Sequence, residues 1–558
     1  MKKSLILLIA CIFSVTGLAQ PTLLDDNLAL RSVTTLPTET VRLEYNPVNQ
    51  TLYFTTVPGS IYEVNIETGV KTLRQTSANH GLGDLQGFDI SSDGKFYIVG
   101  NIRDGANFTN TGVIKRGELV DGTWTWVTVA ETAPYPLSNT FFDHIMNGIV
   151  VSPDNKFLYV NSGSRTDHGE VHSVDGRYPD LRETALTAKI LRVPADSTDL
   201  YLEDDLATLK SSGYIYAEGI RNSFSLAFDK DNNLFAVENA GERDDPGEFN
   251  LIESGKHYGF PWRVGGNDTP MQFTPYDPDQ DIMLQKETNA YQFGFFYNDP
   301  DYPTPPEGVE FTEPILNSGP DAVSYRNHIT GEILDAFEED TVISSFTAHR
   351  SMLGLTFDTN GEFGGNFTED AFSLGFSGGN DNGFFLRWMD DPGKDLLHME
   401  LTPSGDTFTM TTTALARDFI SPIDAEIIGN KMYIAEYRNG SWLNVGADTR
   451  IWEITFPAFG TSTEDDNSVV EDYSLQQNYP NPFNPATTIT YELNKAGFVE
   501  IDVSDALGRH VSTLVSSNKN AQTHSVRFNA TNLSSGVYFY TLRVNGIAAS
   551  TKRMLLIK

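Results

Sequence analysis

Residues Gly148–Gly163 read GIVVSPDNKFLYVNSG: an alternating apolar run, a polar turn and an aromatic-rich run. Alternation with a period of two is typical of β-strands, and the Ser-Pro-Asp-Asn cluster between the runs predicts a turn. The pattern recurs in RLEYNPVNQTLYFTT from Arg42, GFDISSDGKFYIVGN from Gly87, SLAFDKDNNLFAVENA from Ser225 and DAEIIGNKMYIAEY from Asp424. A degenerate copy, LGLTFDTNGEF from Leu353, has lost the regular return strand.

Six such units, spaced by several tens of residues, are typical of radial repetition. They predict an all-β fold, a six-bladed β-propeller over residues 20–458, whose short apolar strands pack on neighbouring blades. Tandem sandwiches are the alternative, although the repeat is shorter than a sandwich domain. The widest gap holds a long insertion, residues 270–308, which we expect to wall a cleft on the top face.

The N-terminus predicts export. Lys2 and Lys3 precede an apolar run from Ser4 to Val15, and small residues lead to Gln20. This is the pattern of a secretory signal peptide over residues 1–19, too short to span a membrane and stop there. Cys11, the one cysteine of the chain, lies inside it, so the mature chain has no disulfide. A formal net charge of −36 argues against nucleic-acid binding, because phosphate backbones would be repelled.

The sequence changes character near its C-terminal end. Residues 459–472 are polar and acidic and predict a linker, and residues 473–558 alternate like the strands of a small Ig-like β-sandwich. This segment contains NYPNPFNP from Asn478, LGR from Leu507 and GVY from Gly536, and ends in a basic, apolar run. With these motifs it resembles the type IX secretion sorting domain. The resemblance implies a secreted or cell-surface protein, with the type IX machinery as a partner and no catalysis in this domain.

Generic catalytic motifs are mostly absent, with no HExxH, P-loop, CxxC or dinucleotide fingerprint. GFSGG at residues 375–379 fits a nucleophile elbow, but the NDNGFFLRW that follows does not begin a helix. The turn DKDNN in the fourth unit has the acid spacing of an EF-hand and lacks its glycine and distal glutamate. Neither favours a hydrolase or an EF-hand.

The richest polar segment runs from Gly219 to Trp262. Its charged and amide side chains gather at strand ends, where a propeller's top face places ligand sites: Arg221, Asn222, Glu238, Asn239, Asp244, Asp245 and Glu248. Backbone carbonyls in the loop ENAGERDDPGE, with acids beside them, suit a hard cation such as calcium. The alternative is that Arg221 forms a structural ion pair with one of these acids.

This segment resembles the pyrroloquinoline quinone (PQQ) dependent glucose and sorbosone dehydrogenases. The likeness is carried by Gly-x-Arg-Asn from Gly219, the strand Leu226–Phe228, Glu238, EFNLI from Glu248 and YGFP from Tyr258. It implies PQQ and calcium as cofactors and a small sugar as substrate, with an external electron acceptor. It also implies that Arg221 lies over the quinone and that Asn222 helps to hold it. For the calcium it implies the carbonyls of Ala240 and Gly241. The acids of the same loop, Asp244, Asp245 and Glu248, are the side chains that we expect beside this cation.

A second likeness lies in FFDHIMNGIVVSPDNKFLYVNSGS from Phe141, which puts His144 at the family's general-base position. A neutral imidazole suits the proton of a sugar hydroxyl, and Arg221 or calcium stabilises charge on the reduced quinone. A loop histidine without a catalytic role is the alternative for His144. The sequence departs from the family at Ser223 and Ser225, which replace its usual Pro and Gly.

Cofactor carboxylates need late-blade cations, and Arg387 is the residue predicted to bind the cofactor, with Arg350, Arg417 and Arg438 as further candidates. Three functions follow from these observations. The first is a PQQ- and calcium-dependent sugar dehydrogenase. The second is a non-enzymatic propeller that binds glycans or a surface partner. The third is a calcium-dependent, lactonase-like propeller, for which the sequence offers no converging set of side-chain ligands.

Overall fold

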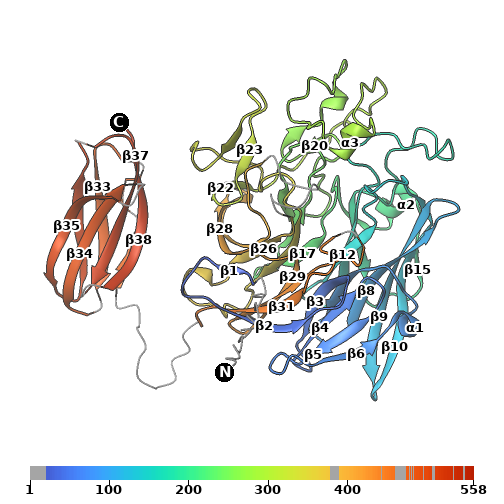
Figure 1. Cartoon of the computed structure of the whole chain (residues 1–558), viewed down its shortest axis with the longest axis horizontal. Coiled ribbons are helices and arrows are strands. Elements are labelled where there is room, and N and C mark those ends of the chain that lie inside the picture. The colour runs from blue at the N-terminus through green and yellow to red at the C-terminus, as the bar shows by residue number, and fades with distance from the viewer. Residues whose placement is uncertain are drawn as a thin grey trace, which may run out of the picture. The chain divides into compact units, whose positions relative to one another are not determined.

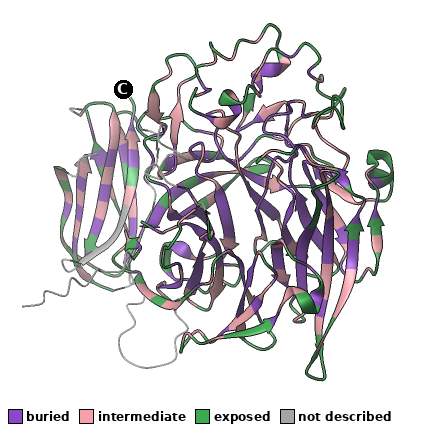
Figure 2. Cartoon of the chain, turned by 45° about the vertical axis from the view of Figure 1, so that its right-hand side comes forward, coloured by how far each residue is buried: buried purple, intermediate pink, exposed green. Residues whose placement is uncertain are grey.

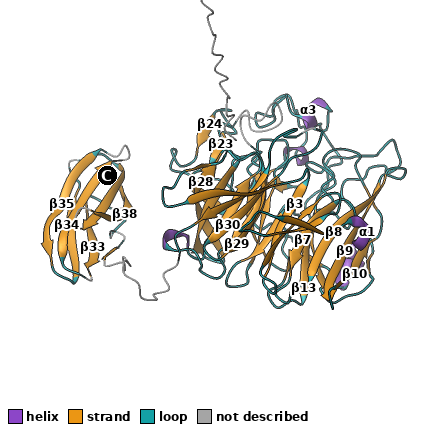
Figure 3. Ribbon diagram, turned by 60° about the horizontal axis from the view of Figure 1, so that its bottom comes forward, coloured by secondary structure: helices purple, strands orange, loops and turns teal. Residues whose placement is uncertain are grey.

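The structure, a computed structural model of the chain, describes residues 20–377, 389–441, 443–458 and 473–558, without 477, 479, 482, 494, 506–508, 532 and 545–546. The predicted signal peptide (1–19), the predicted linker (459–472) and Arg387 lie outside the described residues. The chain divides into two compact units at residue 460. Strands dominate both units and the helices are few and short, so the all-β prediction is confirmed (Figure 3).

Six sheets follow one another around the first unit, and a short strand, its first strand, forms one edge of each (Figure 1). These first strands are β3 (Thr40–Asn46), β7 (Leu85–Ile90), β12 (Met146–Val151), β17 (Ser225–Phe228), β25 (Met352–Phe357) and β29 (Pro422–Ile428). They contact one another in the cyclic order β3, β7, β12, β17, β25, β29 and back to β3. The sheets therefore close into a ring.

Each first strand pairs antiparallel with the strand that returns after the turn. The returning strands are β4 (Thr51–Thr56), β8 (Phe96–Asp104), β13 (Phe157–Ser162), β18 (Leu234–Glu238), β26 (Ala371–Gly375) and β30 (Lys431–Glu436). The residue before a first strand and the residue after its partner thus lie at the same end of the sheet. Loops at that end, although distant in sequence, are brought together by the ring.

Further strands widen the sheets. They are β5 (Ile61–Val64), β6 (Lys71–Gln75), β9 (Thr109–Val120), β10 (Thr123–Thr132), β11 (Tyr135–Pro136), β14 (Lys189–Pro194), β15 (Leu200–Leu202), β16 (Ile215–Glu218), β19 (Glu248–Ile252), β22 (Leu316–Pro320), β27 (Asp395–Ser404), β28 (Thr407–Arg417) and β31 (Arg450–Thr455). Two small hairpins, β20 (Arg263–Val264) with β21 (Asn267–Asp268) and β23 (Ser324–Arg326) with β24 (Ile333–Asp335), lie outside these sheets.

The N-terminal end of the chain closes the ring. Strand β2 (Ala29–Thr35) pairs with β31 in the last sheet, and β1 (Thr22–Leu23) pairs with β28 in the sheet before it. The two ends of the unit are thereby held in shared sheets.

Both faces of the sheets are apolar because each sheet packs on two neighbours. Between the second and third sheets, one core cluster includes Val99, Ile114, Met146, Val160 and Leu191. Figure 2 shows this as buried strands through the body of the unit. Double-sided burial explains why the quoted runs are apolar beyond strict alternation.

The degenerate copy at Leu353 differs from its prediction, because it does have a return strand. β26 pairs with β25 after a longer connection that contains the 3₁₀ turn η2 (Gly365–Phe367). The Asp358 carboxylate orders this connection by accepting from the backbone N–H groups of Glu362, Phe363 and Glu369 at 2.8, 3.1 and 3.1 Å. Because of these extra residues, the turn pattern did not predict the return strand.

The remaining helical turns are α1 (Ser77–His80), α2 (Leu206–Ser211), η1 (Pro270–Gln272) and α3 (Asn289–Gln292). The last two belong to the insertion after the fourth sheet. No helix within the described ranges is long and apolar enough to cross a membrane.

The second unit has two sheets around one core. One contains β32 (Tyr473–Leu475), β33 (Ala486–Leu493) and β36 (Thr523–Asn529), and the other β34 (Gly497–Asp505), β35 (His510–Lys519), β37 (Gly536–Val544) and β38 (Ile547–Leu556). Inward residues alternate with outward ones, as in β33, where Ile489, Tyr491 and Leu493 are buried. The shared core joins both sheets.

Candidate active site

A pocket of about 270 Å³ lies where the loops before β12 and β17 meet the loop after β18. His144, Arg221, Ala240 and Gly241, four of the predicted site residues, all line it. Arg221, Ala240 and Gly241 flank the paired strands β17 and β18 of one sheet, and His144 precedes β12 of the neighbouring sheet, so all four lie at the same end of their strands. The long insertion also contributes to the wall, through Glu287, Thr288 and Asn289.

His144 is partly buried just before β12. Its backbone N–H donates to the Ser164 carbonyl at 2.9 Å, and its Nδ1 lies 3.3 Å from the Ser164 hydroxyl. A Cβ at position 163 would lie 2.2 Å from the His144 carbonyl oxygen, so this close approach requires Gly163. Burial and then the charge of Arg221 lower the pKa of His144 to about 3. The imidazole is therefore neutral at neutral pH.

Arg221 is 3% exposed and held from several sides. Its Nε donates to the Asp167 carbonyl at 2.9 Å, its Nη2 to Asp167 Oδ1 at 2.8 Å, and its Nη1 to the Asn239 carbonyl at 3.0 Å. Its backbone N–H donates to Glu238 Oε1 at 2.7 Å. These side-chain bonds use three of the five guanidinium N–H groups. Arg221 does form an ion pair, but its partner is Asp167 rather than an acid of the loop after β18.

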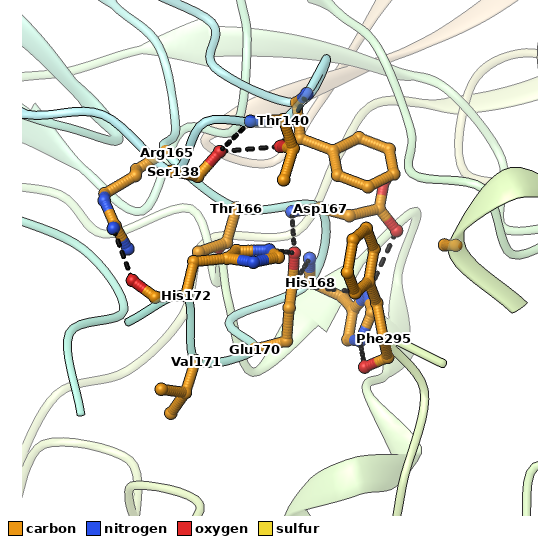
Figure 4. Close-up of polar contacts among 12 residues, drawn as sticks. Ser138, Thr140, Arg165, Thr166, Asp167, His168, Glu170, Val171, His172 and Phe295 are labelled. Carbon is orange, nitrogen blue, oxygen red and sulfur yellow. Dashed lines mark hydrogen bonds and ion pairs between the residues drawn. The ribbon is translucent and has the colours of Figure 1, made fainter. Parts of the chain in front are cut away.

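Asp167 belongs to a buried network that follows β13 (Figure 4). Its Oδ2 lies 2.9 Å from His168 Nδ1. Glu170 accepts from the backbone N–H groups of Asp167 and His168 at 2.9 and 2.8 Å, and its Oε1 lies 2.8 Å from His172 Nε2. The guanidinium of Arg221 is thus the pocket-side end of a chain of acidic and basic groups.

The charges of this network fix its protonation. Burial acts to raise the pKa of Asp167, but the hydrogen bond from His168 and the charge of Arg221 outweigh it and hold the pKa below its usual value. Burial acts to lower the pKa of His168, and the Glu170 and Asp167 carboxylates outweigh it, so this pKa is raised. The sequence analysis did not predict that this segment contributes to the site. Its signal was five ionisable side chains within the nine residues 164–172, directly after a buried strand.

Asn222 does not line the pocket. It is 4% exposed, and its Oδ1 accepts from Asn147 Nδ2 at 2.8 Å and from Asn161 Nδ2 at 3.3 Å. These amides join the entry of β17 to β12 and β13. In the structure, Asn222 therefore links two neighbouring sheets by hydrogen bonds.

The predicted calcium acids are not brought to the pocket either. Asp244 accepts from Arg326 Nε at 2.6 Å and from Gln285 Nε2 at 2.8 Å, and lies 2.7 Å from His349 Nε2. Asp245 accepts from Arg243 Nη1 and Asn267 Nδ2. Glu248 accepts from the Gly265 N–H and from Asn250 Nδ2. The loop folds so that its acids meet the insertion and neighbouring basic groups. The prediction placed these acids beside a calcium ion, and in the structure their oxygens have protein partners.

The carbonyls of Ala240 and Gly241 are in a different situation. Within the part of the chain that the structure describes, no residue donates a hydrogen bond to either oxygen. The same described residues contain no group of three or more His, Cys, Asp or Glu side chains that could hold a metal ion.

Two further carboxylates of the pocket were not predicted. Glu242 Oε2 accepts from the Ala290 N–H at 2.5 Å, and burial followed by the Asp167 charge raises the pKa of Glu242 to about 7. Glu287 is exposed on the insertion. His349, which enters from before β25, pairs with Asp244.

The late-sheet arginines have mostly structural partners. Arg350 pairs with Asp391 and Asp395, and Arg417 Nη2 lies 2.6 Å from Asp321 Oδ1. Arg438, which follows β30, has a carbonyl neighbour instead, with Nη2 3.5 Å from the Leu36 oxygen. Arg387 lies outside the described residues.

Two family models match the chain. The one described as Glucose / Sorbosone dehydrogenase matches residues 44–284, which include His144, Arg221 and the loop after β18. Residues 44–284 belong to the glucose/sorbosone dehydrogenase family. The enzyme class is accordingly an oxidoreductase of the sugar dehydrogenase type. The model described as Secretion system C-terminal sorting domain matches residues 477–558, which marks the chain for export. No curated protein is similar enough to count as a match.

Several solved structures align with most of this chain at low sequence identity. The PQQ-bound aldose sugar dehydrogenase of Streptomyces coelicolor is 17% identical, with 78% of this chain and 98% of that one covered and a TM-score of 0.44. The apo-form soluble aldose sugar dehydrogenase of Escherichia coli is 15% identical, with coverage of 77% and 99% and a TM-score of 0.46. The PQQ domain of pyranose dehydrogenase from Coprinopsis cinerea is 11% identical, with coverage of 78% and 97% and a TM-score of 0.46.

Proposed function

We propose that this protein is a secreted or surface-bound quinoprotein that oxidises an aldose or related sugar with PQQ and calcium. The observation that carries the proposal is the meeting of His144, Arg221, Ala240 and Gly241 in one pocket within the matched segment. Arg221, Ala240 and Gly241 flank the strand pair β17–β18, and the packing of neighbouring sheets adds His144, which is distant from them in sequence.

The architecture supports the same assignment. We interpret the ring of six sheets as a six-bladed β-propeller and the second unit as an Ig-like sandwich that addresses the chain to the type IX machinery. The catalytic end is then the one where the first strands begin. The sandwich serves sorting alone.

His144 is the proposed base. Its Nδ1 faces the Ser164 hydroxyl, which leaves Nε2 as the nitrogen that accepts the proton of the sugar O–H. Oxidation of a hemiacetal breaks this O–H bond and the C–H bond of the same carbon, and the C–H electron pair leaves as hydride. The product is a lactone. The imidazole is neutral, which is the protonation state that a base requires.

The pocket offers a cationic hydrogen-bond donor and several oxygen atoms, which suit the quinone end of PQQ together with a calcium ion. Arg221 is a cation with N–H groups beyond those it uses for Asp167 and Asn239. Asn239 Oδ1 is buried, and no described residue donates to it. The carbonyls of Ala240 and Gly241 are oxygen ligands of the kind that calcium prefers. PQQ, when bound, supplies the acceptor for the hydride, and an external acceptor then removes two electrons to complete the cycle.

The carboxylates of PQQ require cations, and the described part of the pocket also presents Glu242 and Glu287. We propose Arg387 and Arg438 for this role, since Arg350 and Arg417 already have carboxylate partners. The acids in the wall are the observation that favours the second candidate function. Without sufficient cations, the same pocket would bind a neutral glycan and perform no oxidation.

One experiment separates the two functions. The purified full chain is mixed with PQQ, with and without calcium, passed through a desalting column and assayed by absorbance and by dye reduction with a panel of aldoses. We expect calcium-dependent PQQ retention and sugar-dependent dye reduction. Failure to retain PQQ in the presence of calcium would rule out the quinoprotein assignment, and glycan binding by the cofactor-free protein would then support the second function.

A further inference from the structure

A groove of about 650 Å³ lies between the outer strands of the first two sheets. Strands β5 and β6 contribute to one wall, and β9 and β10 contribute to the other (Figure 1). Trp124 and Trp126 line this tryptophan groove. None of the residues that line it also lines the candidate active site, so the two are separate places on the molecule.

The strand register places the tryptophan groove toward the end of the ring opposite to the candidate active site. In the second sheet, Ile90 pairs with Phe96, and Phe96 pairs with Gly117. Gly117 pairs in turn with Trp126, so Trp126 lies level with the last residue of β7. The candidate active site lies where the first strands begin, so a ligand in the groove leaves that site open.

The two indole rings are held in fixed positions. Trp124 and Trp126 lie on the same face of β10, because alternate side chains of a strand point the same way. Their ring planes are nearly parallel, at 18°, with centroids 5.9 Å apart, and Trp124 packs on buried Phe96 at 4.5 Å. A Cβ at position 117 would lie 2.6 Å from the Trp126 ring, so Gly117 lets this indole lie against β9. Both indoles remain partly exposed.

Hydrogen-bonding groups surround the rings. Gln75 Oε1 accepts from Trp126 Nε1 at 3.2 Å, which orients that indole. Arg74 uses its Nε for an ion pair, and Asn79 uses its Oδ1 to accept from the Thr76 backbone N–H at 2.8 Å. Within the described ranges, no residue accepts from the Arg74 Nη groups or from Asn79 Nδ2, and both side chains line the groove. These donors are available to a ligand.

The charge of the groove favours a neutral ligand. Arg74 and Glu63 are its charged residues, and they pair with each other at 2.7 Å. The rest of the chain, with a formal net charge of −36, repels anionic polymers. A neutral sugar chain has apolar C–H faces, which suit indole rings, and hydroxyl groups, which exchange hydrogen bonds with arginine, amide and carboxylate groups. The chemistry of the groove therefore matches a neutral carbohydrate.

The groove is large enough for more than one sugar unit. Its volume of about 650 Å³ is more than twice the roughly 270 Å³ of the candidate active site and lies within the usual range for ligand pockets, about 300–1,000 Å³. Leu73 and Leu119, which also line it, are 49% and 54% exposed. The walls are thus open to solvent, and a chain longer than the groove can continue past them.

We propose that the tryptophan groove binds a neutral polysaccharide chain, with Trp124 and Trp126 under successive sugar units and Arg74 and Asn79 donating to hydroxyl groups. This binding goes beyond the proposed function, because it requires neither PQQ nor calcium nor oxidation. It would hold the protein on a carbohydrate polymer while the other end of the ring stays free. Stacking of one sugar face on an indole covers roughly 60 Å² of apolar surface, which corresponds to about tenfold in the dissociation constant.

Affinity electrophoresis of the full chain without PQQ tests the proposal. Native gels contain soluble starch, hydroxyethyl cellulose or laminarin, and alginate serves as the anionic comparison. We expect at least one neutral glucan to retard the wild type and alginate not to. Trp124→Ala and Arg74→Ala should each weaken this retardation, with a dissociation constant about tenfold higher for Trp124→Ala. The Arg74 side chain is 46% exposed, so its variant tests the groove even where loss of an indole lowers stability.

The second sheet offers matched controls outside the groove. Tyr201 is 50% exposed on β15, and Arg103, whose side chain is 52% exposed on β8, pairs with one carboxylate as Arg74 does. Neither residue lines the groove, so Tyr201→Ala and Arg103→Ala should be retarded like the wild type.

Three results would overturn the proposal. One is the absence of retardation by all three neutral glucans, or retardation that both groove variants retain in full. Another is equal retardation by alginate, which would show binding without preference for a neutral chain. The third is a wild-type dimer in size-exclusion chromatography that Trp124→Ala converts to a monomer, which would assign the groove to a second copy of this chain. Since none of these measurements uses the cofactor, failure to retain PQQ leaves their outcome unaffected.

Discussion

At the scale of single residues, His144 has the clearest chemical role. The ring is neutral, partly buried and within reach of the Ser164 hydroxyl, so a ring nitrogen can accept a proton. Replacing it with glutamine keeps much of the volume and removes the basic nitrogen. We expect His144→Gln to lower kcat by about 10²-fold or more while PQQ retention persists. Steady-state kinetics beside cofactor absorbance measures both.

The exposed His328 provides the matched control for this prediction. His328→Gln is expected to keep the wild-type kcat. Turnover of His144→Gln equal to that of the wild type would refute the proposed base, whereas loss of PQQ from this variant would show a binding role instead.

Asp167 positions Arg221 and is itself fully buried. Breaking a buried ion pair leaves an uncompensated charge, at a cost of about 3–5 kcal/mol. Asp167→Asn should therefore lower the melting temperature and weaken PQQ retention together. The control Asp84→Asn removes an ion pair with Arg103, which is 52% exposed, and should change stability by about 1 kcal/mol or less. Equal melting temperatures for the two variants would contradict this role of Asp167.

At the scale of elements, turn chemistry predicted the repeated strand pairs well. Units such as Gly148–Gly163 carry short turns that a sequence makes visible. The return strand after β25 was not predicted, because the connection to β26 is longer and is ordered by the Asp358 side chain and not by a short turn. The sequence also predicted four pocket residues and missed Asp167, Glu242 and the partners of Asp244. Their contacts depend on how the loop after β18 folds against the insertion, which spacing alone does not reveal.

The connection between β25 and β26 provides a test at this scale. Asp358 is 1% exposed and accepts three backbone N–H groups. Asp358→Ala leaves these donors buried without partners, so we expect a loss of about 2–4 kcal/mol in the free energy of unfolding. Asp406→Ala, at an exposed turn, is the control and should fall within about 0.5 kcal/mol of the wild type. Chemical denaturation measures both, and similar values for the two variants would contradict the ordering role of Asp358.

At the scale of the whole molecule, the ring encloses a cavity of about 560 Å³ lined by acids of the first strands. Burial raises the pKa of Asp424 to about 6, and burial with repulsion from Asp424 raises that of Asp89 to about 6. Burial and repulsion from neighbouring carboxylates raise the pKa of Glu44 and Glu426 well above the usual value. Between about pH 4 and pH 6 the folded state therefore binds more protons than the unfolded chain.

The free energy of unfolding should accordingly fall as pH rises through this window. We expect the melting temperature to be about 2–4 °C higher at pH 5.5 than at pH 7.5. Glu426→Gln should raise the value at pH 7.5 and reduce the difference between the two conditions. Thermal denaturation of the full chain checks this, and a melting temperature that rises with pH would contradict it.

The central claim is that one end of the ring binds PQQ and passes sugar electrons to it with His144 as base. Rapid mixing of the PQQ- and calcium-loaded protein with glucose, in the absence of an external acceptor, tests this most directly. We predict that the quinone absorbance disappears in a single turnover, more slowly with C1-deuterated glucose, and about 10²-fold more slowly in PQQ-loaded His144→Gln. Absorbance that is unchanged by any sugar, or lost equally fast in the variant, would contradict the account.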